Sequence, residues 1–351
     1  MRVLPCLLAL LLGGSYPVTA DILYRVTDLG TLGGTSSYGA ALNNAGQVTG
    51  YAQTATGTYH AFLYTDGQMR DLGTLGGIEN ASSGTGLNES GQVVGTVDFL
   101  TGESHAFLYC NGQMTDLGTL PGYSSSYGNG INNFGQVVGT ARTSTGVEHA
   151  FLYTDGQMSD LGTLGGVLAN SSGNGINDAR QIVGATGTAS GPSHAFLYTN
   201  SQMTDLGTLG GRSSYGTAIN QAGQVTGRAD TTDAAHAFLY REGQMTDLDT
   251  LGGSISDGLG INKAGQVVGT YLNTTRRGAF LSCHDQMVDL NDLIDPALHL
   301  ALSQATAIND QGQIVANQIT FIGRQQVLHA YLLTPMPNQV PGYCSAWRSW
   351  Y

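Results

Sequence analysis

One unit of about 44 residues recurs along this 351-residue chain, and it constrains the fold more than any other feature of the sequence. Three motifs mark each copy: His-Ala-Phe, Asn-x-x-Gly-Gln-Val and Asp-Leu-Gly-Thr-Leu, each with occasional substitutions. All three give the same count of seven, and the Asp-Leu motifs follow one another at intervals of 42 to 45 residues. A fixed period of this length is typical of folds in which each repeat packs against its neighbours.

The first residues of the motifs define the copies. The histidine motif begins at His60, His105, His149, His194, His236 and His329, with Gly278 in the place of histidine in the sixth copy. The aspartate motif begins at Asp28, Asp71, Asp116, Asp160, Asp205, Asp247 and Asp289. The asparagine motif begins at Asn43, Asn88, Asn132, Asn177, Asn220, Asn262 and Asn309.

Each copy is predicted to contain four short strands joined by tight turns. In the second copy we expect these strands at residues 85–87, 92–96, 105–109 and 113–117. The first turn contains Asn88 and Gly91, and the last is Asn111 followed by Gly112; both patterns are hairpin signals, because Asn and Gly tolerate positive φ. The last turn has either two residues or three with a bulge, so its register stays open.

The two ends of the repeat region are complementary. The chain begins it with a fourth strand at residues 24–29 and ends it with a third strand at residues 329–333. Pairing these two segments would remove an exposed sheet edge. We therefore predict an all-β fold, a seven-bladed β-propeller of four-stranded antiparallel blades that is closed by the N-terminal strand completing the last blade.

The N-terminal segment is typical of a secretory signal peptide. Arg2 precedes an apolar run at residues 7–12, and Val18-Thr19-Ala20 is a small-residue cleavage site. We therefore expect a signal peptide at 1–20, a propeller at 21–335 and a C-terminal tail at 336–351. The expected location is the periplasm or the medium, after cleavage near Ala20.

The charge of the chain limits its partners. It has 13 basic and 25 acidic residues, a formal net charge of −12, and a single lysine at Lys263. A nucleic-acid binder needs basic stripes to neutralise phosphates, so nucleic acid is excluded as a partner. No segment after the first 20 residues has the roughly 18 apolar residues of a membrane span. We expect a monomer that binds no cofactor and no metal.

Three cysteines remain after cleavage: Cys110, Cys283 and Cys344. Cys110 and Cys283 occupy the same position in two different copies, so a ring of repeats would keep them apart. If a disulfide forms, the predicted pair is Cys283 with Cys344.

The motifs together resemble a bacterial extracellular repeat family named for its His-Ala-Phe (HAF) tripeptide. The resemblance rests on His-Ala-Phe-Leu-Tyr, Gly-Ile-Asn-x-x-Gly-Gln-Val-Val-Gly and Asp-Leu-Gly-Thr-Leu-Gly-Gly, and it covers roughly residues 22–335. It implies a secreted propeller and does not imply an activity. Gly278, Arg180 and Asp249 depart from the motifs. The seventh aspartate motif also departs, since residues 288–292 read Val-Asp-Leu-Asn-Asp.

The repeated histidines and aspartates are predicted to be structural, because a residue present in nearly every copy cannot mark one active centre. We expect each histidine to pair with the aspartate of the following strand through a buried, charge-assisted hydrogen bond. The repeated phenylalanines, such as Phe62, are expected in the core.

One position varies between copies in a way that favours ligand binding. Five residues before each motif asparagine stand Tyr38, Ser83, Tyr127, Ser172, Tyr215, Asp257 and Gln304. This position is expected near one mouth of the central channel, and its tyrosines, with Asp257 and Gln304, are the candidate ligand-binding residues. The alternative is that the alternation records duplication of a two-copy block, with tyrosine merely packing between blades.

The sequence leaves two functions open. The first is a non-catalytic binding or scaffold propeller for a peptide, glycan or surface partner. The second is an extracellular hydrolase or lyase. The residues unique to one copy gather at Arg276, Arg277, His284, Asp285, Asp289, Asp292, Asp295 and His299. Since none of the common catalytic or metal-binding spacings occurs there, an irregular acidic loop is favoured over a site, and we assign no catalytic residue.

Overall fold

The computed structural model describes residues 23–166, 169–283, 286–323 and 325–337. The first strand is β1 (Tyr24–Asp28). The first three copies then contain β2 (Gly33–Leu42), β3 (Val48–Thr54), β4 (Tyr59–Thr65), β5 (Gln68–Asp71), β6 (Ala81–Leu87), β7 (Val93–Asp98), β8 (Ser104–Cys110), β9 (Gln113–Asp116), β10 (Ser125–Ile131), β11 (Val137–Arg142), β12 (Glu148–Thr154) and β13 (Gln157–Asp160). The next three contain β14 (Ser171–Ile176), β15 (Ile182–Gly187), β16 (Ser193–Thr199), β17 (Gln202–Asp205), β18 (Ser214–Ile219), β19 (Val225–Asp230), β20 (Ala235–Arg241), β21 (Gln244–Asp247), β22 (Ile255–Ile261), β23 (Val267–Leu272), β24 (Arg277–Cys283) and β25 (Gln286–Asp289).

The last copy differs from the others. It contains β26 (Leu302–Ile308), β27 (Ile314–Ile322) and β28 (Gln325–Pro335), and two 3-10 helices precede it, η1 (Leu290–Leu293) and η2 (Pro296–Leu298). The sequence predicted an irregular acidic loop within residues 276–299. The first part of this stretch belongs to β24 and β25, and the second part forms the two short helical turns. Asp289 and Asp295 cap them by accepting hydrogen bonds from the backbone amides of Asn291 and Ala297.

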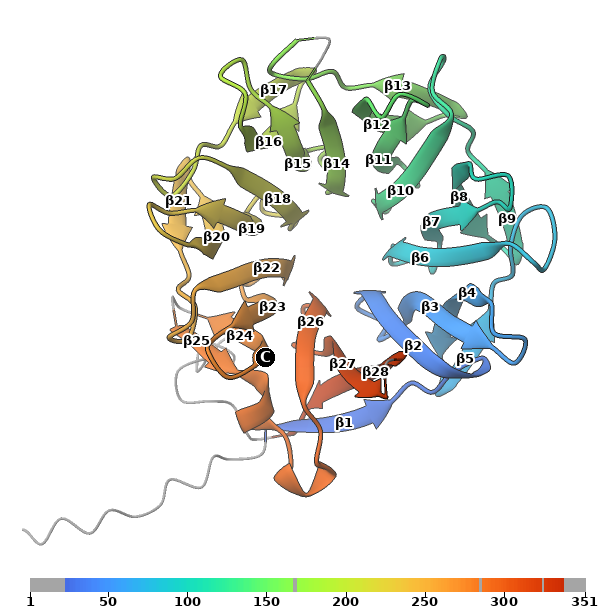
Figure 1. Ribbon diagram of the computed structural model, residues 1–351, viewed down its shortest axis with the longest axis vertical. Helices are drawn as coiled ribbons and strands as arrows, with labels where there is room; N and C mark the ends of the chain where they lie inside the picture. Colours follow the sequence, from blue (N-terminus) through green and yellow to red (C-terminus); the bar gives the residue numbers. More distant parts are fainter. Residues whose placement is uncertain (1–22, 167–168, 284–285, 324, 338–351) are drawn as a thin grey trace, which may run out of the picture.

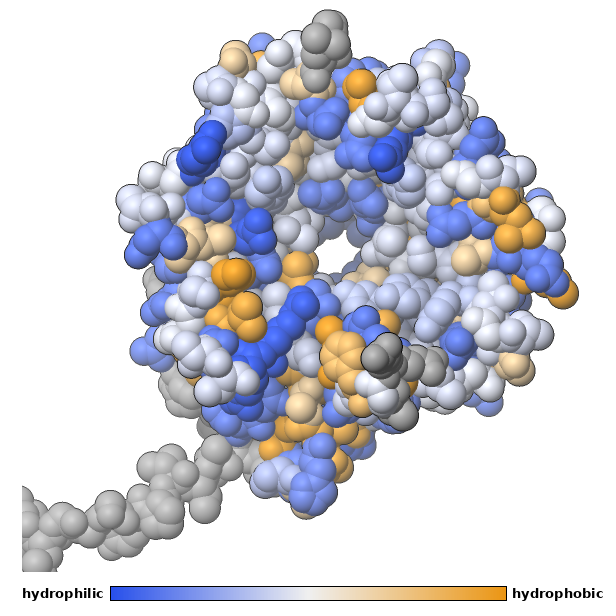
Figure 2. Space-filling view, viewed as in Figure 1, coloured by the Kyte–Doolittle hydropathy of each residue, from blue (hydrophilic) through white to orange (hydrophobic). Residues whose placement is uncertain are grey.

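The chain is all-β, and its unit is a four-stranded antiparallel sheet. Strands follow one another in sequence order within most sheets, as in β2-β3-β4-β5 and β6-β7-β8-β9. One sheet has eight strands, because a single parallel pair, Ala235 with Ile255, links two such four-stranded runs. Figure 1 shows the sheets arranged around a central opening, with the first strand of each copy innermost. The opening persists when side chains are drawn (Figure 2).

The hairpin between the third and fourth strands has a two-residue loop. Cys110 pairs with Gln113, and the intervening Asn111 and Gly112 have φ of 52° and 84°. Two successive positive φ angles suit the twist of an antiparallel pair, which is why Asn-Gly or Asp-Gly stands here in three of the copies. The structure thus decides the register that the sequence left open.

The predicted phenylalanines form the core. Six of them are fully buried: Phe62, Phe107, Phe151, Phe196, Phe238 and Phe280. Most of them pack against a glycine of the second strand. A Cβ on Gly139, for example, would lie 2.7 Å from the ring of Phe151 and 2.0 Å from the carbonyl oxygen of Tyr127. The second glycine of Gly-Gln-Val-Val-Gly therefore leaves room for the inner strand on one side of the second strand and for the phenylalanine ring on the other.

A cycle of hydrogen bonds joins the copies at the first hairpin. The side-chain Nδ2 of each motif asparagine donates to the backbone oxygen of the next motif asparagine at 2.9–3.2 Å, and that of Asn309 donates to the oxygen of Asn43. The same Nδ2 of Asn132 also donates to Gln136 Oε1, and its Oδ1 accepts from the amides of Phe134 and Gln136. The buried amide of Asn132 is therefore fully bonded.

A buried serine supplies a second link between copies. Ser82 Oγ, on the inner strand of the second copy, accepts from the amide of Ala61 and donates to the oxygen of Gly73, both in the first copy. Equivalent pairs of bonds are made by Ser126, Ser171, Ser214 and Ser256. Each of these inner strands is thus joined by hydrogen bonds to the third strand of the preceding copy and to the loop that follows its fourth strand.

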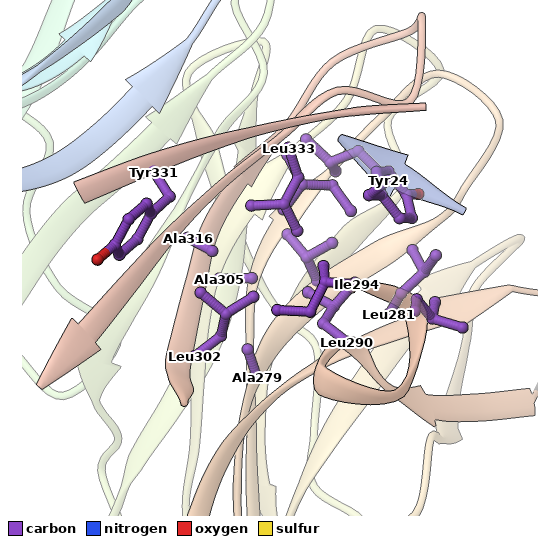
Figure 3. Packing of buried hydrophobic residues seen from close by; sticks show 14 of the residues in the cluster. Tyr24, Ala279, Leu281, Leu290, Ile294, Leu302, Ala305, Ala316, Tyr331 and Leu333 are labelled. Atoms are coloured by element: carbon purple, nitrogen blue, oxygen red, sulfur yellow. The ribbon is translucent and has the colours of Figure 1, made fainter. Parts of the chain in front are cut away.

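The N-terminal strand lies beside the last strand. β1 pairs antiparallel with β28 from Tyr24 opposite Pro335 to Asp28 opposite Tyr331. Figure 3 shows Tyr24 in the same apolar cluster as Leu333 of β28 and Leu290 of η1. The two ends of the repeat region, far apart in sequence, therefore share one sheet and one core cluster. Among the described residues there is no helix long and apolar enough to cross a membrane.

The asparagine cycle predicts a site-specific loss of stability. Asn132→Ala should lower the free energy of unfolding by about 2–3 kcal/mol, because it leaves buried backbone and glutamine groups without partners. Phe134→Ala, at an exposed position of the same hairpin, is the matched control. Urea unfolding of both variants measures the difference, and equal stabilities would contradict a structural role for the cycle.

Candidate functional site

The candidate ligand-binding residues occupy equivalent places on the inner strands. Each faces a second-strand partner: Tyr38 opposite Tyr51, Ser83 opposite Thr96, Tyr127 opposite Thr140, Ser172 opposite Ala185, Tyr215 opposite Arg228, Asp257 opposite Thr270 and Gln304 opposite Asn317. The position five residues before each motif asparagine is thus the same register position on every inner strand, at the same level around the central opening.

Tyr38 bridges the first and last copies. Its Oη donates to Gln304 Oε1 at 3.2 Å, and its ring stacks on that of Tyr51 with centroids 5.1 Å apart. Burial raises the pKa of the Tyr38 phenol to about 12, and neighbouring Tyr51 adds to the shift. The phenol therefore stays neutral and remains a hydrogen-bond donor at every physiological pH.

Tyr215 and Asp257 meet through an arginine that the sequence motifs did not single out. Arg228 Nε lies 3.5 Å from Asp257 Oδ1, and its guanidinium carbon lies 5.6 Å from the centroid of the Tyr215 ring. That Nε is buried and makes no hydrogen bond within the described chain. Burial raises the pKa of Asp257, although Arg228 and Arg277 both favour the ionised carboxylate. The Tyr215 side chain remains accessible, since the residue is 39% exposed.

A second arginine, Arg277, is close to both the Tyr38–Gln304 pair and the Arg228–Asp257 pair. Its Nε donates to Thr270 Oγ1 at 3.0 Å, and its charge acts on both Tyr38 and Asp257. We call the assembly the inner-strand cluster, which consists of Tyr38, Tyr51, Tyr215, Arg228, Asp257, Arg277 and Gln304. Figure 2 shows a strongly hydrophilic band that runs to the central opening over the region of β22–β26.

The structure brings four of the five candidates into this cluster. Tyr127 stands at the equivalent place on β10, in a copy outside the group. Sequence reasoning missed Arg228 and Tyr51 because it compared only inner-strand positions. A signal was present: Arg228 and Tyr51 interrupt a second-strand position that is threonine in three of the other copies.

The predicted pairing of histidine with aspartate is confirmed in five copies. Histidine Nδ1 lies 2.7–2.9 Å from aspartate Oδ2 in His60–Asp71, His105–Asp116, His149–Asp160, His194–Asp205 and His236–Asp247. The expectation that these pairs are buried was wrong. The aspartate side chains are 41–42% exposed, because they lie on the outermost strand at the edge of each sheet.

The sixth copy replaces the histidine by two other side chains. Asp289 accepts hydrogen bonds from Tyr271 Oη and from the Arg276 guanidinium, and it is buried. A Cβ on Gly278 would lie 2.5–2.6 Å from atoms of the Tyr271 side chain. The glycine is therefore required because Tyr271 fills the place of the histidine. Arg276 and Asp289 serve the fold here, as the position of Asp289 in the repeat indicated.

The other unusual residues do not assemble into a metal site. Within the described ranges, no group of three or more His, Cys, Asp or Glu side chains is arranged to hold a metal ion. His284 and Asp285 lie outside the described residues. Cys110 is free and Cys283 is disulfide-bonded. Cys344, the predicted partner of Cys283, also lies outside the described residues, so that pairing stays a prediction.

No family model and no curated protein matches this chain. Solved structures do resemble it. The β-propeller domain of the Trilobed protease from Pyrococcus furiosus has a TM-score of 0.52 at 7% identity, with 87% of this chain and 100% of that domain covered. A puromycin-hydrolyzing peptidase of Mycobacterium tuberculosis gives 0.52 at 10% identity, with 84% and 51% covered. TolB from Acinetobacter baumannii gives 0.48 at 13% identity, with 68% and 61% covered.

The chain thus spans about half the length of the peptidase and 61% of TolB. At 7–10% identity, the two likenesses above 0.5 show the fold alone. This protein has a β-propeller fold.

Because their aspartates are exposed, the histidine–aspartate pairs are expected to contribute little to the stability of the fold. His149→Ala should lower the free energy of unfolding by no more than about 1 kcal/mol, because water competes for a hydrogen bond whose aspartate side chain is 41% exposed. Thermal unfolding measures this loss, and ligand binding should be unchanged. A loss of several kcal/mol would contradict the assignment of these pairs to the sheet edge.

Proposed function

We propose that this protein is a non-catalytic binding propeller that holds a glycan or peptide at the inner-strand cluster. The observation that carries the proposal is the concentration of tyrosine, aspartate and glutamine at one register position of the inner strands, together with arginines from the adjacent second and third strands. These residues come from the fifth, sixth, seventh and first copies. The residues that repeat in nearly every copy are used for pairing and packing. The varying residues are therefore the ones available for recognition.

We further propose that the fold is a seven-bladed propeller closed by its N-terminal strand. The antiparallel pairing of β1 with β28 supports this arrangement, since it gives the last copy a fourth strand. The asparagine cycle supports it as well, because it passes through seven copies and ends where it began. Closure explains how a ring with small, polar, glycine-rich units avoids exposed strand edges.

Removal of the N-terminal strand tests closure. A chain that lacks residues 21–30 should melt roughly 10 °C or more below the 21–351 chain, because the last blade loses a strand and the buried Leu23, Tyr24 and Leu29. Differential scanning calorimetry measures the shift. An unchanged melting curve would refute closure by this strand.

We also propose membership of the HAF-repeat family and export from the cell. The three motifs, in seven copies, support the first, and the apolar run followed by Val18-Thr19-Ala20 supports the second. Fractionation of the producing cells, followed by N-terminal sequencing of the mature protein, tests export. A full-length chain retained in the cytoplasm would contradict it.

The binding function predicts a specific effect at Tyr215, whose ring is accessible. Tyr215→Ala should weaken binding of the preferred saccharide or peptide about tenfold through loss of a stacking surface. Phe134→Ala removes an aromatic side chain that is 74% exposed on a hairpin tip and serves as the control. Binding is measured by calorimetry with ligands found on glycan and peptide arrays.

Product analysis separates binding from catalysis. The bound polymer should be recovered intact after incubation with the protein. Turnover abolished by one substitution within residues 276–299 would instead establish the hydrolase or lyase alternative.

A further inference from the structure

Charge is distributed unevenly in this protein, and the inner-strand cluster departs from the average. The whole chain has a formal net charge of −12. The cluster holds Arg228 and Arg277 against one carboxylate, Asp257, and its tyrosine with the most strongly raised pKa, Tyr38, stays neutral. The local surplus is therefore one positive charge. An acidic protein that concentrates cationic groups beside its central opening favours a negatively charged ligand there.

Arg277 is prepared for such a ligand. It is an exposed residue at the start of β24, and its only side-chain hydrogen bond in the described chain is the one from Nε to Thr270 Oγ1. Thr270 is buried and bonded in turn to the backbone oxygen of Ser303 at 2.9 Å. The threonine thus fixes the plane of the guanidinium and leaves its two terminal NH₂ groups unengaged by the described residues. A planar fork of this kind matches a carboxylate through two parallel hydrogen bonds.

Arg228 provides a second donor from the neighbouring copy. Its ion pair with Asp257 is long, at 3.5 Å, and its guanidinium lies over the accessible ring of Tyr215. The side chain is 40% exposed, so its terminal nitrogens remain open to a ligand. The arginine and the tyrosine ring together offer a charged contact next to a stacking surface.

We propose that the inner-strand cluster recognises an acidic saccharide, with Arg277 and Arg228 binding the carboxylate of a uronic acid. This inference rests on the proposed binding function and names its ligand class. The remaining side chains suit sugar hydroxyls, because the oxygens of Gln304, Asp257 and the Tyr38 phenol can each accept a hydrogen bond. Helical and proline-rich peptides are usually bound in apolar or aromatic-lined grooves, whereas the cluster presents polar side chains and one accessible aromatic ring. A saccharide therefore fits better than a peptide.

Calorimetry with matched ligands tests the proposal. Trimers of galacturonate and mannuronate should bind the mature chain, and at least one should bind about tenfold more tightly than its methyl ester, because esterification removes the charge that the arginines contact. The preference should decrease at high salt. Arg277→Gln should abolish it, whereas Arg70→Gln, on the outermost strand of the first copy, should leave it unchanged.

Thr270 separates a positioning role from a general effect on stability. Thr270→Val keeps the shape of the side chain and the charge of Arg277 but removes the hydrogen bond that orients the guanidinium. It should reduce the preference for the acid over the ester about threefold or more, and Thr270→Ser should restore it. Equal melting temperatures for the two variants would exclude unfolding as the cause.

The outcomes distinguish this inference from the proposed function. If acid and ester bind equally and Tyr215→Ala weakens both, the protein binds glycans and the inference about the carboxylate is wrong. If a glutamate hexapeptide binds more tightly than either uronate trimer, the assignment to a saccharide is overturned while the binding function stands. If neither saccharide nor peptide binds, the proposed function itself fails.

Discussion

The asparagine cycle is the interaction on which the rest of the structure depends. Each copy buries one asparagine whose amide reaches the backbone of the next copy, and the bond from Asn309 to Asn43 returns to the first. A buried amide without partners would cost several times what one hydrogen bond contributes. Every copy must therefore hold its neighbour at the same distance and angle. This requirement fixes the relative placement of the inner strands, and with it the geometry of any site that they line.

This constraint divides each copy into a structural part and a part free to vary. At the hairpin, asparagine and glutamine stand in every copy, and glycine stands in all but the fourth, where Arg180 takes the same positive φ. In five copies the glycine lies against the glutamine of the preceding copy. At the sheet edge, the histidine can be exchanged for other donors to the aspartate, as Tyr271 and Arg276 show by donating to Asp289 in the sixth copy. Between these regions, the positions represented by Tyr38 and Tyr215 carry no structural duty common to all copies. Diversity accumulates there, next to the central opening.

The predictability of the fold follows from the same division. Strand order, hairpin positions, the phenylalanine core and the pairing of histidine with aspartate were all predicted from local patterns. Those contacts join residues within one copy, such as His149 and Asp160, which are 11 positions apart. The exposure of the pairs was not predicted, because the sequence does not say which strand forms the outer edge. The two short helices, η1 and η2, were not predicted either. Their aspartates are N-caps, but the number of acidic residues alone does not distinguish a capped helical turn from an irregular acidic loop.

The sequence by itself determined the repeat, the four-stranded antiparallel unit and the positions at which copies differ, because period and turn chemistry are properties of the local chain. Only the tertiary structure decided which differing side chains meet. Tyr38 and Gln304 are 266 residues apart, and Arg228 contacts Asp257 from the neighbouring copy. A period makes positions in different copies equivalent, but it does not say which side chains reach across to the next copy. The twist and packing of the assembled sheets decide this. They bring four of the five candidate residues into one cluster and place Arg228 and Arg277 beside them.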